Sequence, residues 1–236
     1  LDLAEKVRKK APRAAIHVDG VQGWCKHPLC LRDSAVDSFA LSGHKMHCPK
    51  GIGALYLRKN YKLEPAFFGG GQERGLRPGT ENVPYIVTLG AAAQKYGATV
   101  ASRLENAKKL NTMLREGLAM ITNIELHSPD DASPYVLNFS VPNVRSETML
   151  HFLEAKEIYV SSGSACSKGA ASHTLTAMGL SAAQIDSALR VSFCDTTTPD
   201  DIAALLEGLN EGISALASRM PVPKSTRKPP IEGESR

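Results

Sequence analysis

The sequence predicts an α/β chain in two parts, and three observations carry that prediction. Apolar runs of strand length, each ending in a polar turn, open the chain. Helical repeats of apolar residues follow near 99–119 and again near 198–216. Apolar residues make up 42% of the 236 residues, which is enough for a substantial core. We place the first part at 1–95 and the second, an α+β part, at 96–219.

The first part reads as three strands followed by a helix, and a further helix opens the second part. The strands are "AAIHVDG", "VDSFALSGHK" and "GIGALYL", the last entered through a proline and a glycine. After a glycine- and arginine-rich loop, a helix is predicted from about 81, with Thr80 as its cap. A second helix is predicted at roughly 99–119, since leucines repeat along one face.

The second part alternates short strands with helices. The runs "IELHS", "YVLNFSV", "IYVSS" and "ALRVSF" predict strands, and 146–156 predicts a helix. Ser181 and Gln184 form a capping box three residues apart. Thr198 and Pro199 begin a last helix with one apolar stripe. Residues 220–236 are proline-rich and polar, which predicts a disordered tail.

Composition narrows the class of protein. The net charge is +4, and much of the excess lies in 6–10 and 224–228, which argues against a dedicated nucleic-acid surface. No run reaches the ~18 apolar residues that span a bilayer, and no secretory signal opens the chain. Five irregularly spaced cysteines indicate a reducing compartment, so we expect a cytoplasmic protein. Because the first residue is Leu, we expect the chain to begin inside a fold.

The stretch "SGHKMHCPKG" concentrates titratable side chains at the end of a predicted strand. Lys45, held in a low-dielectric site, could act as nucleophile or base, although most lysines in such places are simply exposed. His44, His47 and Cys48 could suggest zinc, but no second pair of ligands with zinc-site spacing lies nearby, so a metal site is disfavoured.

Three further features are each only weak evidence of a functional site when considered alone. Asp19 and Gln22 follow a strand and could contact a cationic ring and its hydroxyl, although a turn-forming Asp is the commoner reading. The loop "GGGQERGLRPGT", which ends at Thr80, could hold an anion or could be a flexible connection. Arg190, inside an apolar strand, needs a carboxylate partner from protein or substrate.

Cys166 lies among small residues in "SSGSACSKG", where a neighbouring lysine could favour the reactive thiolate. The alternative is a buried, inert thiol. Cys25, Cys30 and Cys194 have no comparable setting and are interpreted as structural.

Together and in this order, these motifs resemble one family, the pyridoxal-phosphate-dependent cysteine desulfurases of the fold-type I, class V aminotransferases. The matching runs are "HVDGVQG", "SGHKMHCPKGIGALYLRK", "GGGQERGLRPGTENV", "SSGSACSKG" and "ALRVSF", and the resemblance covers about 14–217. It implies the second half of a fold-type I large domain followed by the small C-terminal domain. The family's cofactor domain begins well upstream of "HVDGVQG", so its earlier part has no counterpart in this sequence.

The resemblance also implies residue roles. Lys45 matches the lysine that binds pyridoxal 5'-phosphate covalently and then serves as the general base, and Cys166 matches the cysteine that accepts sulfur. Arg190 matches the arginine that binds the substrate carboxylate. The implied cofactor contacts are Asp19 to the ring nitrogen, Gln22 to the ring hydroxyl, Ser42 and His44 to the phosphate, and Thr80 to the phosphate in the other subunit of a homodimer.

The activity implied is conversion of L-cysteine to L-alanine, with sulfur held as a persulfide on Cys166 for an iron–sulfur scaffold or a tRNA-thiolating enzyme. Cys48 departs from the family, which usually has glycine before "PKG", and is interpreted as a packing variant. Two alternatives stay open: a selenocysteine lyase, and a non-catalytic fragment that needs the missing N-terminal half.

Overall fold

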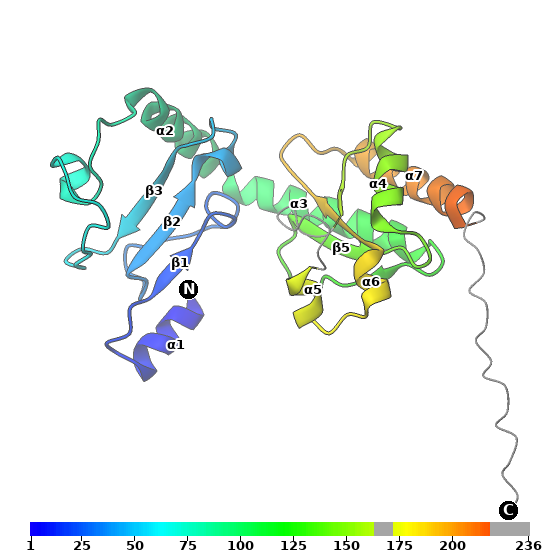
Figure 1. Ribbon diagram of the computed structural model, residues 1–236, viewed down its shortest axis with the longest axis horizontal. Coiled ribbons are helices and arrows are strands. Elements are labelled where there is room, and N and C mark those ends of the chain that lie inside the picture. Colours follow the sequence, from blue (N-terminus) through cyan, green and yellow to red (C-terminus); the bar gives the residue numbers. More distant parts are fainter. Residues whose placement is uncertain (163–171, 218–236) are drawn as a thin grey trace, which may run out of the picture. The chain divides into compact units, whose positions relative to one another are not determined.

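The computed structural model describes residues 1–162 and 172–217, and the chain divides into two compact units (Figure 1). The units are Leu1–Asn106 and Ala107–Arg236, and each is described by itself. The predicted tail at 220–236 lies outside the described residues. The division falls inside one helix, α3 (Val100–Ala119), whereas the sequence-based boundary at 95/96 stays a prediction.

The first unit is built on a three-stranded sheet in the order β1-β2-β3. The strands β1 (His17–Asp19) and β2 (Ser38–Ser42) are parallel, and β3 (Gly53–Leu57) pairs antiparallel with β2. All three were predicted from the sequence. Since the carboxyl ends of parallel strands meet at one edge of a sheet, the polar segments that follow β1 and β2 share that edge.

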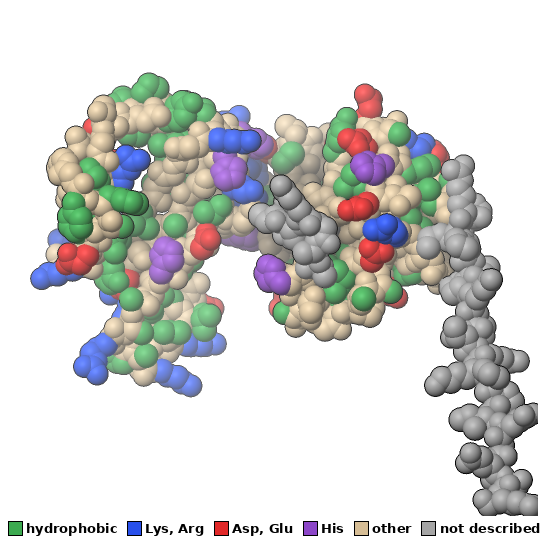
Figure 2. Space-filling view, in the orientation of Figure 1, with side chains coloured by type: hydrophobic (Ala, Val, Ile, Leu, Met, Phe, Trp, Pro, Cys, Tyr) green, Lys and Arg blue, Asp and Glu red, His purple; other side chains and the backbone are tan. Residues whose placement is uncertain are grey.

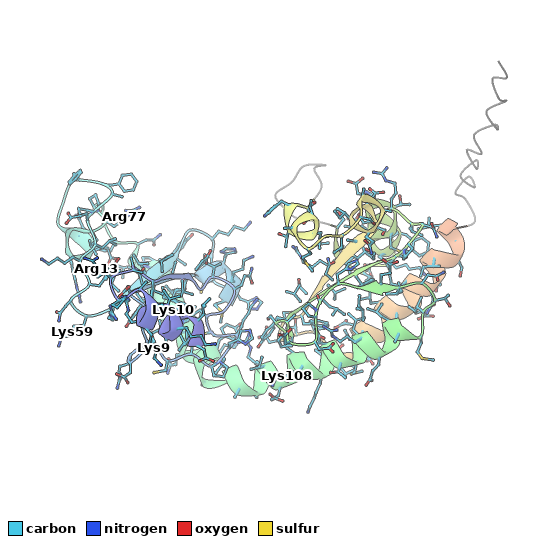
Figure 3. The ribbon with its side chains drawn as sticks, turned by 90° about the horizontal axis from the view of Figure 1, so that it is seen from below. Lys9, Lys10, Arg13, Lys59, Arg77 and Lys108 are labelled. Atoms are coloured by element: carbon cyan, nitrogen blue, oxygen red, sulfur yellow. The ribbon has the colours of Figure 1, made fainter. Side chains whose placement is uncertain are left out.

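A helix that the sequence analysis did not predict, α1 (Asp2–Lys10), precedes this sheet. Its first turn carries Asp2 and Glu5 and its last turn carries basic side chains, which include the surface lysines Lys9 and Lys10 labelled in Figure 3. That charge order suits the helix dipole. Only Ala4 of α1 is buried, so apolar periodicity could not reveal the helix.

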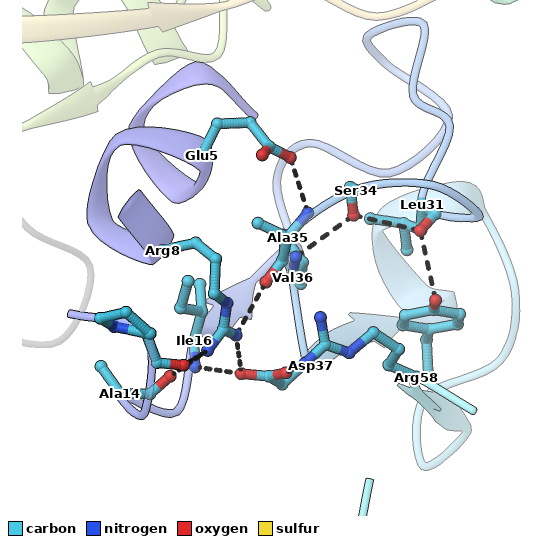
Figure 4. A network of polar contacts seen from close by, with 12 residues as sticks. Glu5, Arg8, Ala14, Ile16, Leu31, Ser34, Ala35, Val36, Asp37 and Arg58 are labelled. Atoms are coloured by element: carbon cyan, nitrogen blue, oxygen red, sulfur yellow. Dashed lines mark hydrogen bonds and ion pairs between the residues drawn. The ribbon is translucent and has the colours of Figure 1, made fainter. Parts of the chain in front are cut away.

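Polar contacts join α1 to the sheet instead (Figure 4). The Oε1 atom of Glu5 accepts a hydrogen bond from Ala35 N at 2.8 Å. Asp37, which is 1% exposed, accepts from Ile16 N at 2.8 Å and from Arg8 Nη2 at 2.6 Å, and it also pairs with Arg58. One buried carboxylate therefore connects α1, the start of β1 and the end of β3.

The helix α2 (Val83–Ala98) begins later than predicted, and its cap is Asn82, not Thr80. The Oδ1 atom of Asn82 accepts a hydrogen bond from Tyr85 N at 3.3 Å. Pro84 explains the error: in a helix capped by Thr80 it would be the fourth residue, whose N–H is the first required within the helix. A start at Val83 puts Pro84 in the first turn, where no N–H is needed.

Between β3 and α2, a 3₁₀ turn, η2 (Gln72–Gly75), lies within the glycine-rich segment. Hydrophobic side chains remain on the surface over α2 (Figure 2), among them Val83, Ile86 and Val87.

The second unit contains a four-stranded antiparallel sheet in the order β4-β5-β7-β6. Its central strands are β5 (Val136–Ser140) and β7 (Ala188–Ser192), flanked by β4 (Glu125–Leu126) and β6 (Ser161–Ser162). The outer strands are shorter than the apolar runs that predicted them.

One face of this sheet packs against α3, α4 (Ser146–Glu154) and α7 (Pro199–Ala217). These elements and the strands build one apolar core that includes Leu110, Leu114, Phe139, Met149, Leu153, Leu189 and Leu209. Two short helices, α5 (His173–Ala177) and α6 (Ala182–Asp186), lie between β6 and β7 in the chain. Among the described residues, no helix is long and apolar enough to cross a membrane.

Both predicted caps of the second unit are confirmed. Ser181 Oγ accepts from Gln184 N at 3.3 Å, and Gln184 Oε1 accepts from Ser181 N at 2.8 Å. Thr198 Oγ1 accepts from Asp201 N at 3.3 Å, and Asp201 Oδ2 accepts from Thr198 N at 2.8 Å. The predicted stripe of α7 is also confirmed, since its members pack in the core: Ile202, Leu205, Leu206, Leu209, Ile213 and Leu216.

Candidate active site

The candidate site of the first unit is the turn that follows β2, a single 3₁₀ turn named η1 (Gly43–Met46). It carries His44 and Lys45 as exposed side chains directly after Ser42, the last residue of the strand. A Cβ added to Gly43 would lie 2.7 Å from Ile52 Cγ2 and 3.2 Å from Ile52 O. The turn can therefore approach the start of β3 this closely only with glycine, and that approach fixes where Lys45 leaves the backbone.

The turn is supported by α2. Met46 is 1% exposed, and the ring of His47 lies 5.7 Å from that of Tyr96, centroid to centroid. The sulfur of Cys48 lies 3.6 Å from Thr88 O, and burial raises the pKa of the Cys48 thiol. His47 and Cys48 thus contact the helix that supports the turn, as expected if Cys48 is a packing variant.

Within the described residues, no three His, Cys, Asp or Glu side chains form a group that could hold a metal ion. The segment that carries Lys45 also brings two other predicted site residues together. Ser42 Oγ and His44 Nδ1 are 2.7 Å apart, so the structure joins two of the predicted phosphate contacts directly. A hydroxyl and an imidazole in contact, on a turn that also carries a lysine, form a donor set suited to an anion.

Asp19 lies at the same edge of the sheet. It is the last residue of β1 and pairs with Ala40, two residues before Ser42 in the parallel neighbour. Its Oδ1 atom accepts from Val21 N at 3.0 Å, which is the turn-forming role that Asp commonly has. Its second oxygen accepts no hydrogen bond from the described part of the chain. Gln22, in the turn after β1, accepts from Lys26 Nζ at 3.1 Å.

The remaining predicted residues are not joined to this group. Thr80 is exposed in the segment between η2 and α2. Arg190 is in the second unit, half-buried on β7. Cys166 lies outside the described residues, so its role stays a prediction.

Sequence reasoning missed the setting of Cys194, an exposed residue before α7. Partial burial raises the pKa of its thiol, but hydrogen bonds from the side chains and backbone of Thr196 and Thr197 outweigh burial and lower it. The Cys194 sulfur lies 3.1 Å from Thr196 Oγ1. Threonines two and three positions after the cysteine were the available signal. Burial is the larger influence at Cys25, where it raises the pKa of the thiol against the charge of Arg103.

Comparison with known proteins places the chain in a family. The description "Aminotransferase class-V" matches residues 2–205. A cysteine desulfurase of Nostoc sp. is 37% identical over 224 residues, which cover 93% of this chain and 56% of the relative. The cysteine desulfurase IscS of Methanosarcina thermophila is 38% identical over 215 residues, or 89% of this chain and 53% of the relative.

Solved structures of similar proteins share the fold of this chain. A NifS-like protein is 35% identical with a TM-score of 0.82, over 91% of this chain and 56% of that one. The NifS-like protein of Rickettsia africae is 32% identical with a TM-score of 0.80, over 90% and 57% of the two chains. The predicted fold class is confirmed.

The chain belongs to the aminotransferase class-V family. Cysteine desulfurases of this family are pyridoxal-phosphate-dependent enzymes. The chain spans slightly more than half the length of the relatives it matches.

Proposed function

We propose that the chain is part of a cysteine desulfurase, which converts L-cysteine to L-alanine and holds the sulfur as a persulfide on Cys166. The observation that carries the proposal is the grouping of Asp19, Ser42, His44 and Lys45 at one edge of the first sheet. Support also comes from relatives named cysteine desulfurases, and from a structure titled "SspA in complex with cysteine", which is 31% identical with a TM-score of 0.63 over 81% of this chain.

The residues present fit pyridoxal 5'-phosphate. Ser42 and His44 supply a hydroxyl and an imidazole 2.7 Å apart for the phosphate, and the exposed Lys45 supplies an amine for covalent attachment. Asp19 supplies a carboxylate for the ring nitrogen, and Gln22 supplies an amide for the ring hydroxyl. When bound, the cofactor supplies an electron sink for the carbon next to the substrate carboxylate.

The chain's own residues do the rest of the proposed chemistry. Lys45 Nζ takes the proton from the substrate's α-carbon as general base. Arg190 binds the substrate carboxylate through its planar pair of N–H donors. The Cys166 thiolate attacks the substrate sulfur, so one sulfur–sulfur bond forms as the carbon–sulfur bond breaks. Alanine leaves after its carbons regain protons.

Further proposals concern the oligomeric state, the location and the sulfur acceptor of the enzyme. We propose a homodimer in which Thr80 contacts the phosphate bound by the other subunit, in a cytoplasmic protein. The sulfur acceptor is an iron–sulfur scaffold or a tRNA-thiolating enzyme. A selenocysteine lyase is the alternative with the same residues, and relative rates on cysteine and selenocysteine distinguish the two.

The attachment of the cofactor is testable on the chain itself. After incubation with pyridoxal 5'-phosphate and reduction with borohydride, peptide mapping should find the label on Lys45. Lys50→Ala is the matched control, because Lys50 is an exposed lysine of the same segment. Lys45→Ala should lose the label and Lys50→Ala should keep it. A label that stays in Lys45→Ala refutes the assignment, and an unlabelled chain favours the non-catalytic fragment.

The sulfur acceptor is tested by mass spectrometry of the full-length protein after incubation with cofactor and L-cysteine. Cys166→Ala should abolish the added sulfur atom and leave cofactor uptake intact. Cys194→Ala is the sharper control, because its thiol is exposed and has a lowered pKa. It should keep the persulfide, as should Cys48→Ala. Loss of the persulfide in Cys194→Ala with retention in Cys166→Ala would show that the nucleophile is misassigned.

A further inference from the structure

Three polar side chains form a row across the sheet of the second unit. Asn138 on β5 pairs in register with Arg190 on β7, and Arg190 pairs on its other side with Ser161 on β6. The neighbours of Asn138 and Arg190 along their strands, such as Phe139 and Leu189, are buried in the core. Because side chains alternate between the faces of a strand, the row occupies the face opposite that core.

The side chain of Asn138 has a hydrogen-bond acceptor that lacks a donor. Its Oδ1 atom is buried and has no hydrogen-bond partner among the described residues. The backbone N–H of Asn138 donates to Ser128 Oγ at 2.9 Å, and its carbonyl accepts from His127 N at 2.9 Å. A buried amide oxygen without a donor destabilises the folded state, because it has lost its hydrogen bonds to water. Such a group needs an explanation, and an interaction made only in another state of the protein is one.

Arg190 is the donor at the next position across the sheet. Its guanidinium has five N–H donors and no acceptor. That guanidinium makes no hydrogen bond or ion pair with residues 1–162 or 172–217. Directly opposed residues of an antiparallel pair have Cβ atoms about 4.5–5.5 Å apart, so the amide of Asn138 is within reach of the Arg190 side chain.

We propose that Asn138 is a positioning residue for Arg190, an inference that rests on the proposed function of Arg190 as the substrate-carboxylate site. Two N–H groups of the guanidinium bind the carboxylate side by side, and another N–H donates to Asn138 Oδ1. Holding a long arginine in one rotamer costs conformational entropy, and the hydrogen bond to the amide oxygen offsets that cost. Asn138 therefore lowers the KM for L-cysteine and leaves kcat nearly unchanged.

The test is steady-state kinetics on the full-length protein. One hydrogen bond to a charged group contributes at least about 1.5 kcal/mol, so Asn138→Ala should raise KM for L-cysteine about tenfold and change kcat less than about twofold. Ser161→Ala is the matched control, because Ser161 flanks Arg190 on the other side and is not among the described residues with a buried, unpartnered polar atom. The KM of this variant for L-cysteine should stay within about twofold of the unaltered protein. Asn138→Asp is the second variant: its carboxylate pairs with Arg190 and should raise KM at least as much.

A double-mutant cycle separates positioning from a general structural effect. In the Arg190→Ala background, Asn138→Ala should add no further increase in KM, because the group it positions is gone. Fully additive effects, or a lower kcat at constant KM, overturn the inference.

Phenylglyoxal modifies arginine, and L-alanine bound at Arg190 should protect that side chain, which peptide mass spectrometry can measure. The experiment tests the carboxylate-binding role of Arg190 separately from the positioning role of Asn138. No protection in the unaltered protein refutes the carboxylate role of Arg190 and with it the inference. Equal protection in the unaltered and Asn138→Ala proteins refutes only the role of Asn138. Protection that needs about tenfold more L-alanine in Asn138→Ala supports it.

Discussion

Replacing Asp37 by Asn should loosen the attachment of α1 to the first sheet. The carboxylate of Asp37 is buried and accepts hydrogen bonds from Ile16 N and from Arg8, and it pairs with Arg58 (Figure 4). An amide of the same shape removes the charge and turns an N–H₂ group toward donors. The replacement therefore leaves two arginines without their common partner and tests the charge with little change in volume.

The size of the effect follows from the exposure of the partners. Removing one member of a fully buried ion pair costs about 3–5 kcal/mol. The side chains of Arg8 and Arg58 are 23% and 37% exposed, so water can solvate them in part after the change. We therefore expect a cost at the lower end of this range, about 3 kcal/mol. That cost corresponds to roughly a 100-fold change in the equilibrium constant for local opening.

Hydrogen exchange at the Ile16 amide reports this opening directly, because that N–H donates to Asp37 Oδ2 at 2.8 Å. Its exchange should accelerate roughly 100-fold in Asp37→Asn if exchange proceeds through local opening. Asp33→Asn is the matched control, since Asp33 is an exposed carboxylate four residues earlier. An Ile16 amide that exchanges no faster in Asp37→Asn than in the control would refute the reasoning.

Two further predictions concern stability. Burial by itself raises the pKa of Asp37, but the hydrogen bonds from Ile16 N and Arg8 and the two arginine charges outweigh it and lower that pKa below 3.8. The stabilisation is therefore complete above about pH 4 and is lost as pH falls through the lowered pKa, so protection of the Ile16 amide should drop in acid and become pH-independent in Asp37→Asn. Gly117→Ala should lower the urea midpoint, because its Cβ would lie 2.2 Å from Leu206 Cδ1, at a cost of about 1–3 kcal/mol. Gly97→Ala, with nothing within 4 Å, should instead stabilise α2 by up to about 1 kcal/mol; a lower midpoint there, or an unchanged one in Gly117→Ala, contradicts the packing argument.

The sequence by itself determined the features that depend on neighbours along the chain. The caps at Ser181 and Thr198 use a partner three residues away, so their residue types were enough to place them. The stripe of α7 repeats with the helical period, and its burial was predictable for the same reason. The turn after β2 was recognisable because Gly43, His44 and Lys45 are consecutive, although its residue roles came from resemblance to a family.

Only the tertiary structure decided which distant residues meet. Asp37 contacts Arg8 and Arg58, which are 29 and 21 residues away, and no local pattern predicts that partnership. Asn138 and Arg190 became neighbours because β5 pairs with β7 in one register, and a shift by one residue would have placed Asn138 on the core face. Strand pairing and buried charge are long-range interactions. They are settled by what the folded chain brings together, whereas caps and helical stripes are already present in the order of the residues.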